Sequence, residues 1–148
     1  MKCGAFGARV FGMKILSNVE RESKKISGDW FTGDAWMDVV VNPTAPSRAQ
    51  AVYVSFSPGA RTNWHTHPVG QTLHVVSGVG WVQLEGEAAR RIAAGDVVVI
   101  APGENHWHGA DATHTMVHLA MQEADETGKN VVWGTPVTAE EYARAGKV

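Results

Sequence analysis

The sequence lacks the features that mark disulfide-bridged, membrane-spanning and nucleic-acid-binding proteins. It contains a single cysteine, Cys3, so no disulfide bridge can form within the chain. This fits a reducing compartment or a secreted protein that needs no bridge, and the cytoplasm is the simpler expectation. No apolar run approaches the roughly 18 residues that a membrane-spanning helix needs. The formal net charge is only -2. We therefore expect no membrane and no nucleic acid as a partner, and a small molecule as the substrate.

Residues 1–12 also lack the apolar run of a secretory signal peptide. They are small and mildly basic, and Met13 offers a second plausible start. We interpret residues 1–12 as a flexible extension or a misassigned start. Residues 13–148 are then expected to form one domain, because 148 residues is the length of an ordinary domain with one core.

The chain is rich in residues that end short segments. Its 16 glycines and 6 prolines divide it into pieces rich in Val, Thr and Trp, which is typical of many short strands. The predicted strands are residues 35–41, 51–57, 71–76, 80–85, 90–93, 97–100, 114–122 and 131–133. No helical pattern lies between them, so we expect one all-β barrel or sandwich. Only the C-terminal stretch is predicted to be helical, because Thr138 and Glu141 have the spacing of a capping box.

Two histidine pairs carry the first sign of chemistry. In RTNWHTHPVGQ, residues 61–71, His65 and His67 are two apart, so on an extended segment both side chains point to the same side. A turn over residues 68–70 then allows Gln71 to return its amide oxygen toward the same point. His106 and His108 form a second pair after another turn. Imidazoles are common transition-metal ligands, so the two pairs together predict a metal site.

A third source of histidine is the predicted strand 114–122. The period of two places His118 and Gln122 on the same face, with Met116 as an interior packing residue. We interpret His74 and His114 as surface or structural residues. The aromatic side chains Trp64, Trp81, Trp107 and Trp133 are expected to pack in the core or at an interface.

These residues resemble the two motifs of the cupins, a family of small β-barrels. Gly59, His65, His67 and Gly78 match the first motif, and Gly95, Gly103 and His106 match the second. The sequence departs from the motifs at Gln71, where the family has an acidic residue, at Pro102, which is displaced by one position, and at Ala110, which replaces the usual asparagine.

The substitution at Gln71 narrows the resemblance. Together with the stretches DWFTG, PGENHWHGA and HLAMQE, it makes the chain similar to the bacterial manganese-dependent cupin hydroxynitrile lyases. The resemblance implies a single-domain cupin β-barrel of the jelly-roll type with a short C-terminal helix. It also implies one divalent metal ion per chain, with Mn²⁺ favoured over Fe²⁺, Ni²⁺ or Zn²⁺. The implied ligands are His65, His67, Gln71 and His106, and the implied pocket residues are Val52, Val54, His108, His118 and Gln122.

The residue types suit the cleavage of a cyanohydrin into an aldehyde and cyanide. Three neutral imidazoles and an amide leave the charge of the ion uncompensated, so it acts as a strong Lewis acid on the substrate hydroxyl. We expect His118 to take the hydroxyl proton, with His108 as the second choice. Gln122 could orient the leaving cyanide, and Val52 and Val54 would form an apolar wall.

Two other functions remain open at this level. The same ligands would serve a dioxygenase or another metal-dependent cupin enzyme, with iron as the metal. A ligand-binding cupin without catalytic activity is a third reading, although no helix-turn-helix segment and no second barrel are evident. The six tryptophans and the edges of an open barrel also predict a homodimer or homotetramer.

Overall fold

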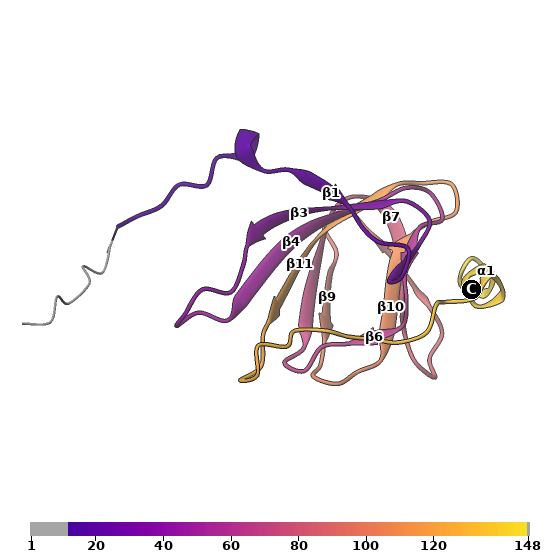
Figure 1. Cartoon of the computed structure of the whole chain (residues 1–148). Coiled ribbons are helices and arrows are strands. Elements are labelled where there is room, and N and C mark those ends of the chain that lie inside the picture. The colour runs from indigo at the N-terminus through magenta and orange to yellow at the C-terminus, as the bar shows by residue number, and fades with distance from the viewer. Residues whose placement is uncertain (1–11, 148) are drawn as a thin grey trace, which may run out of the picture.

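The computed structural model describes residues 12–147, and its regular structure is almost entirely β (Figure 1). A 3₁₀ turn, η1 (Asn18–Glu20), precedes the strands, and a short helix, α1 (Ala139–Ala145), follows them. The strands are β1 (Ser23–Lys25), β2 (Phe31–Thr32), β3 (Ala35–Val41), β4 (Ala49–Phe56), β5 (Arg61–Thr62), β6 (His65–Thr66), β7 (Gln71–Leu84), β8 (Arg90–Ala93), β9 (Val97–Ile100), β10 (His106–Ala110), β11 (Met116–Glu123) and β12 (Val132–Trp133).

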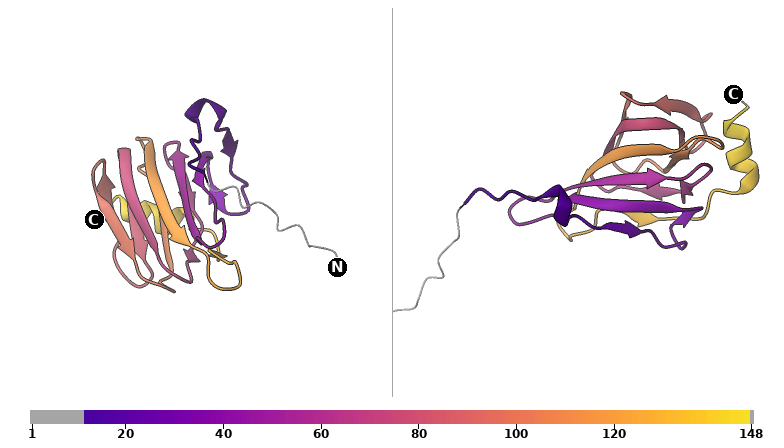
Figure 2. Two further views of the ribbon diagram at one scale, coloured as in Figure 1. Left: turned by 90° about the vertical axis from the view of Figure 1, so that its left-hand side faces the viewer. Right: turned by 90° about the horizontal axis from the view of Figure 1, so that it is seen from above.

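The strands form two antiparallel sheets that share β7. Sheet A has the order β1-β3-β4-β11-β7-β9, and the left view of Figure 2 looks onto its outer side. In sheet B, β7 pairs with β8 and β10, β10 pairs with β5 and β6, β5 pairs with β2, and β6 pairs with β12. The two sheets curl around a common interior, which confirms the predicted all-β barrel (Figures 1 and 2).

The predicted strands agree with the structure where the apolar pattern is long. Residues 35–41, 90–93 and 97–100 have the predicted bounds, whereas residues 71–76 and 80–85 belong to one continuous strand, β7. The prediction missed β1, β2, β5, β6 and β10, because these strands are short or rich in histidine and their pairing partners are distant in the chain. Residues 1–11, most of the predicted extension, lie outside the described residues.

Alternation along sheet A places one set of side chains in the interior. Val52, Val54 and Phe56 of β4 are buried, as are Leu73 and Val75 of β7, while the residues between them are partly exposed. Met116, His118 and Ala120 of β11 follow the same rule, so His118 faces the interior with the apolar core. The strand period alone therefore brings β11 side chains to the cavity described below.

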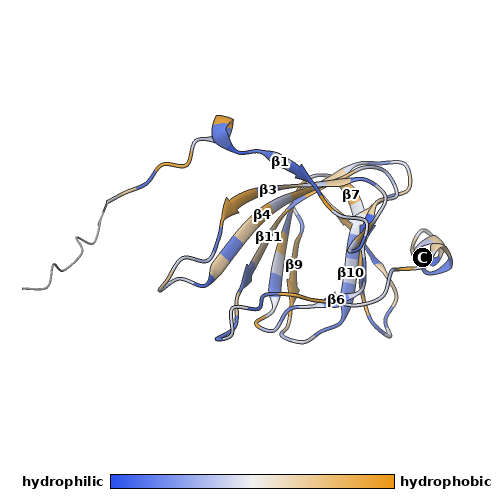
Figure 3. Ribbon diagram, viewed as in Figure 1, coloured by the Kyte–Doolittle hydropathy of each residue, from blue (hydrophilic) through white to orange (hydrophobic). Residues whose placement is uncertain are grey.

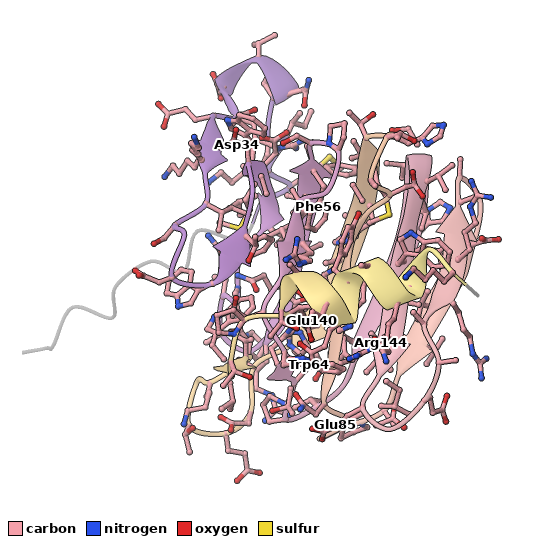
Figure 4. All side chains as sticks on the ribbon, turned by 90° about the vertical axis from the view of Figure 1, so that its right-hand side faces the viewer. Asp34, Phe56, Trp64, Glu85, Glu140 and Arg144 are labelled. Carbon is pink, nitrogen blue, oxygen red and sulfur yellow. The ribbon has the colours of Figure 1, made fainter. Side chains whose placement is uncertain are left out.

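A second, smaller core lies outside sheet B, beneath α1. Trp64, Trp81 and Trp107 pack there with Val137 and Ala145, which confirms the packing role predicted for these tryptophans. Figure 4 shows α1 lying across the sheet near Trp64, with Glu140 and Arg144 on the helix. The capping box is present, because the Thr138 side chain accepts from Glu141 N–H at 3.1 Å and the Glu141 carboxylate accepts from Thr138 N–H at 2.7 Å. Neither α1 nor any other helix in residues 12–147 has the length and apolar character needed to cross a membrane.

Gly78 marks the point where β7 passes from sheet A to sheet B. Its φ is +77°, in the left-handed region, and a Cβ at this position would overlap the carbonyl oxygen of Thr115 on the neighbouring chain segment. Only glycine meets both conditions, so the long shared strand depends on it.

Replacing Gly78 by alanine is expected to destabilise the fold more than the same change at Gly128. Both positions have a positive φ, +77° and +86°, but a Cβ at Gly128 has no atom within 4 Å. Gly128→Ala should cost about 1–2 kcal/mol from backbone strain alone. Gly78→Ala should cost about 1–3 kcal/mol more, because the methyl group is forced against backbone. Urea unfolding of both variants measures the difference, and equal losses would contradict the close approach at Gly78.

Candidate metal centre

The predicted site residues come together around one cavity between the sheets. The cavity has a volume of about 440 Å³. Its polar lining includes His65, His67, Gln71, His108, His118 and Gln122, and its apolar lining includes Val52 and Val54. His106 lies directly behind Gln71, with its Nε2 atom 3.2 Å from Gln71 Oε1. Every residue of the predicted site is therefore placed at or beside this cavity.

Three of the histidines have the same hydrogen-bonding arrangement. In each of His65, His67 and His106, Nδ1 faces a backbone carbonyl oxygen. These carbonyls belong to Asn63, Asn130 and Glu104, at 2.9, 2.5 and 2.9 Å. A carbonyl oxygen can only accept, so the proton sits on Nδ1 and Nε2 carries a bare lone pair. This is the arrangement that metal-binding histidines usually show.

The unprotonated Nε2 atoms of His106 and His67 have no hydrogen-bond donor near them among the described residues. His106 Nε2 and Gln71 Oε1 are 3.2 Å apart, and with the His106 proton on Nδ1 neither atom can donate to the other. His67 Nε2 is buried and has no hydrogen-bond partner among the described residues. Two acceptors in contact and an unpartnered buried lone pair are costly by themselves, and a cation satisfies both. The residues therefore fit a divalent metal ion.

His108 is also close enough to take part. The ligand nitrogens of His65, His106 and His108 all lie within 4.8 Å of one another. His108 differs from the other histidines in its second nitrogen, because its Nδ1 faces His118 Nε2 at 3.1 Å instead of a backbone carbonyl. His67 is not in this group, although its ring centroid lies 5.1 Å from that of His65. The structure therefore brings His65, His106 and His108 together most closely, with His67 and Gln71 beside them.

Burial favours the neutral form of all five imidazoles, His65, His67, His106, His108 and His118. Burial is the main cause that lowers each pKa: the pKa of His106 and that of His118 fall to about 4, and those of His65 and His108 fall well below the usual value. The pKa of His67 is lowered by the same desolvation. Neighbouring imidazoles add to the effect at His65 and His108. Neutral imidazoles are what a metal ion requires as ligands and what a general base requires before it accepts a proton.

The pair of His108 and His118 offers one base nitrogen to the cavity. Their hydrogen bond holds a single proton, so one ring donates and the other accepts. The outer nitrogens, His108 Nε2 and His118 Nδ1, are both buried without a partner among residues 12–147. In either tautomer one of these atoms is an N–H group and the other is a bare lone pair. The ring of Phe56 lies against both imidazoles. Its centroid is 6.0 Å from that of His108 and 5.3 Å from that of His118.

A chain of amides joins two of the candidate ligands, and the sequence analysis missed it. Gln71 Nε2 donates to Gln122 Oε1 at 3.2 Å, and Gln122 Nε2 donates to Gln50 Oε1 at 2.8 Å. The same Gln50 oxygen accepts from Asn130 Nδ2 at 2.7 Å, and the Asn130 carbonyl oxygen faces His67 Nδ1. Each amide fixes the orientation of the next, so Gln71 must turn its oxygen toward His106. No local sequence pattern signals Gln50 or Asn130, since they lie 80 residues apart.

Part of the cavity wall is apolar. Phe31, Met37, Val52 and Val54 line it, together with Trp133, whose ring centroid is 4.8 Å from that of His65. Trp133 was predicted to pack in the core or at an interface, and the structure places it in the cavity wall. His114 is exposed in the loop before β11, where its Nδ1 atom lies 3.1 Å from Asp111 Oδ1.

Comparison with known proteins agrees with this geometry. The family model described as a cupin domain matches residues 52–121. An (R)-mandelonitrile lyase from Granulicella tundricola is 48% identical over 132 residues, which cover 89% of this chain and 100% of that protein. The crystal structure of a cupin-like protein from Thermotoga maritima superimposes with a TM-score of 0.78 at 40% identity, covering 84% of this chain and 94% of that one. A polyketide cyclase from Streptomyces resistomycificus shares the fold alone, with a TM-score of 0.69 at 16% identity over 88% and 91% of the two chains.

Removing the amide chain at Gln50 is expected to weaken metal binding. Gln50→Leu deletes the oxygen that accepts from both Gln122 and Asn130. Loss of such supporting contacts typically lowers metal affinity about 10- to 100-fold. Gln50→Glu keeps an acceptor and should retain most of the affinity. Competition between the purified protein and a fluorescent chelator for Mn²⁺ measures the change directly.

The matched control for this experiment is Gln83→Leu. The Gln83 amide bonds Trp107 and the Glu87 carbonyl, outside the cavity, so its loss should leave the Mn²⁺ affinity unchanged. Equal affinities for Gln50→Leu and the parent protein would show that the amide chain does not position the ligands.

Proposed function

The chain belongs to the cupin family, and on that premise we propose that it is a metal-dependent hydroxynitrile lyase acting on cyanohydrins of the mandelonitrile type. The observation that carries the proposal is the cavity, in which a candidate metal centre, a neutral imidazole pair and an apolar wall meet. The name of the Granulicella relative, which this chain matches over that protein's whole length, supports the same reaction.

His65, His67, Gln71 and His106 are proposed to hold one divalent ion, with Mn²⁺ the favoured metal. When bound, the ion supplies Lewis acidity, and its charge is not reduced by any of these uncharged ligands. Gln71 suits this role because its amide has two different ends. Its oxygen faces His106, and its nitrogen is tied to Gln122, so the side chain contributes a ligand without adding a negative charge.

The imidazole pair is proposed to move the proton, with His118 as the base and His108 as its partner. The base takes the proton of the cyanohydrin hydroxyl, and the electron pair of the O–H bond becomes the second bond of the aldehyde carbonyl. The carbon–carbon bond to the nitrile then breaks, and its electron pair leaves with cyanide. Return of the proton gives hydrogen cyanide and restores the neutral pair.

Gln122 and the apolar wall are proposed to orient the two ends of the substrate. One hydrogen of Gln122 Nε2 is committed to Gln50, which leaves the second hydrogen available to the nitrogen of the leaving cyanide. Val52, Val54 and Trp133 line the part of the cavity that would receive the aromatic or aliphatic side group. These side chains also keep water from the reacting carbon.

Purified protein loaded with Mn²⁺ is expected to release cyanide from mandelonitrile, and removal of the metal by a chelator should abolish the release. Adding Mn²⁺ back should restore it. The test measures cyanide release by a colorimetric assay and the metal content of the same samples. Turnover should be the same with and without dioxygen. Unchanged turnover in metal-free protein would refute the metal-dependent mechanism, and a requirement for dioxygen would favour a dioxygenase.

His118→Ala is expected to lower kcat for cyanide release by at least about 100-fold, because a general base typically contributes that much. Metal content should stay near that of the parent, since His118 is not among the proposed ligands. His114→Ala is the matched control, because His114 is an exposed histidine in the loop before β11. Full activity of His118→Ala with bound metal would remove this residue from the role of base.

A further inference from the structure

An aromatic cluster lines the cavity beside the candidate metal centre. Trp30 and Trp133 stack almost in parallel, with ring centroids 5.8 Å apart and an angle of 7° between the planes, and Phe31 packs against Trp133 at 5.8 Å. All three residues line the cavity. The Trp133 ring also contacts His65, with centroids 4.8 Å apart. We call Trp30, Phe31 and Trp133 the aromatic lip.

The aromatic lip leads from the candidate metal centre to the surface of the protein. His65 is 2% exposed, Trp133 is partly buried, and Trp30 is 45% exposed. A side group attached to a carbon that reacts beside His65 would therefore lie along Trp133 and extend toward Trp30. An aromatic side group gains more from this surface than an aliphatic one does, because aromatic pairs are stabilised beyond the apolar area that they bury.

Residues 26–31 carry Trp30 and Phe31, and the strand before them does not anchor them through buried side chains. This strand, β1, is polar, and all three of its residues are exposed (Figure 3). The backbone N–H of Trp30 closes a local turn by donating to the Ser27 carbonyl oxygen at 3.2 Å. The position of Trp30 relative to Trp133 therefore depends on contacts with the barrel.

Asn63 supplies contacts to both halves of the aromatic lip. Its side-chain Nδ2 atom donates to the carbonyl oxygen of Asp29 at 3.0 Å and to that of Gly134 at 3.2 Å. The first carbonyl belongs to the residue before Trp30, and the second to the residue after Trp133. The backbone N–H of Asn63 donates to the Trp30 carbonyl oxygen at 2.8 Å. Asn63 is 3% exposed, so water competes little for these bonds.

Asn63 also contacts a candidate metal ligand. Its carbonyl oxygen faces His65 Nδ1 at 2.9 Å, the contact that makes His65 Nε2 a bare lone pair. Its Oδ1 atom is buried without a hydrogen-bond partner among residues 12–147, so the bonds donated by Nδ2 set the orientation of the amide. One buried residue thus fixes the His65 ring and joins the two segments that carry the aromatic lip.

We propose that the aromatic lip selects cyanohydrins and aldehydes with an aromatic side group, that Trp30 is the specificity-determining residue, and that Asn63 is a positioning residue that holds Trp30 against Trp133. The inference rests on the proposed lyase activity and names the side group that the same site accepts. A planar aromatic ring packs along the lip, whereas a saturated ring of similar size gains only the burial of its apolar surface.

The first test compares kcat/KM for mandelonitrile with kcat/KM for the cyanohydrin of cyclohexanecarboxaldehyde. Trp30→Ala is expected to lower the ratio of the two values roughly 3- to 10-fold, mainly through the KM of mandelonitrile, and Trp30→Phe should retain most of the ratio. Trp36→Ala is the matched control. Trp36 is exposed on β3 between Ala35 and Met37, which lie on the inner side of the sheet, so Trp36 points away from the cavity. A parent-like ratio in Trp30→Ala would refute the role of Trp30.

The second test addresses the positioning role of Asn63. Asn63→Ala should lower the same ratio by the same factor as Trp30→Ala, with circular dichroism showing that the chain is folded. Asn63→Ser, a milder change that keeps one donor, takes its place where Asn63→Ala does not fold. Because Asn63 acts on the substrate through Trp30, the ratio of the double variant should be no lower than that of either single variant. Additive losses, or a folded Asn63 variant with the parent's ratio, would overturn this role.

The control for this second test is Gln83→Leu. It removes the bonds of a side-chain amide outside the cavity and should leave the ratio unchanged.

A binding measurement separates this inference from the proposed function. Isothermal titration calorimetry of the Mn²⁺-loaded protein with benzyl alcohol and with cyclohexylmethanol requires no turnover. The parent should bind benzyl alcohol more tightly, and Trp30→Ala should lose this preference. A protein that shows the preference but releases no cyanide would refute the lyase activity and leave the aromatic lip standing. A protein that releases cyanide but binds both alcohols equally would refute the aromatic lip alone.

Discussion

The chemistry of the cavity depends on three backbone carbonyl oxygens that fix the protons of three histidines. Each carbonyl holds Nδ1–H of its imidazole, so the opposite nitrogen is a bare lone pair. Burial favours the neutral rings, since a buried imidazolium would lose most of its hydration. Without the carbonyls, His65, His67 and His106 could adopt either tautomer and would share protons with one another. With them, each ring presents a bare Nε2 lone pair, which is the form that a bound cation requires.

Gln71 suits this cluster better than the carboxylate that its position suggests. An amide accepts at one end and donates at the other, which lets it face His106 and bond Gln122 at the same time. A glutamate would place a carboxylate oxygen against Gln122 Oε1, and Gln122 would have to turn and lose its bond to Gln50. The neutral ligand is therefore built into a wider network, and the strong Lewis acidity expected of the site has a structural basis beyond a single residue.

Sheet A separates two surfaces that follow from the same strand period. Side chains alternate along β11. His118 and Gln122 face the cavity, whereas Leu119 and Met121 face outward. Both faces of sheet A carry apolar side chains, which is typical of a sheet that is covered on both sides. The cavity wall and the outer face of sheet A thus share their strands, and a shift in the register of β11 would disturb both.

The sequence alone determined the all-β fold, the helix begun by Thr138 and the candidate site residues, because these rest on local spacing, strand period and a motif shared with the cupins. It could not show Gln50 and Asn130, since their bonds join residues 80 apart in the chain. Nor could it show that His108 Nδ1 faces His118 or that Trp133 enters the cavity wall. Tautomers and amide orientations depend on strand register and on the contacts between sheets, which only the tertiary structure decides.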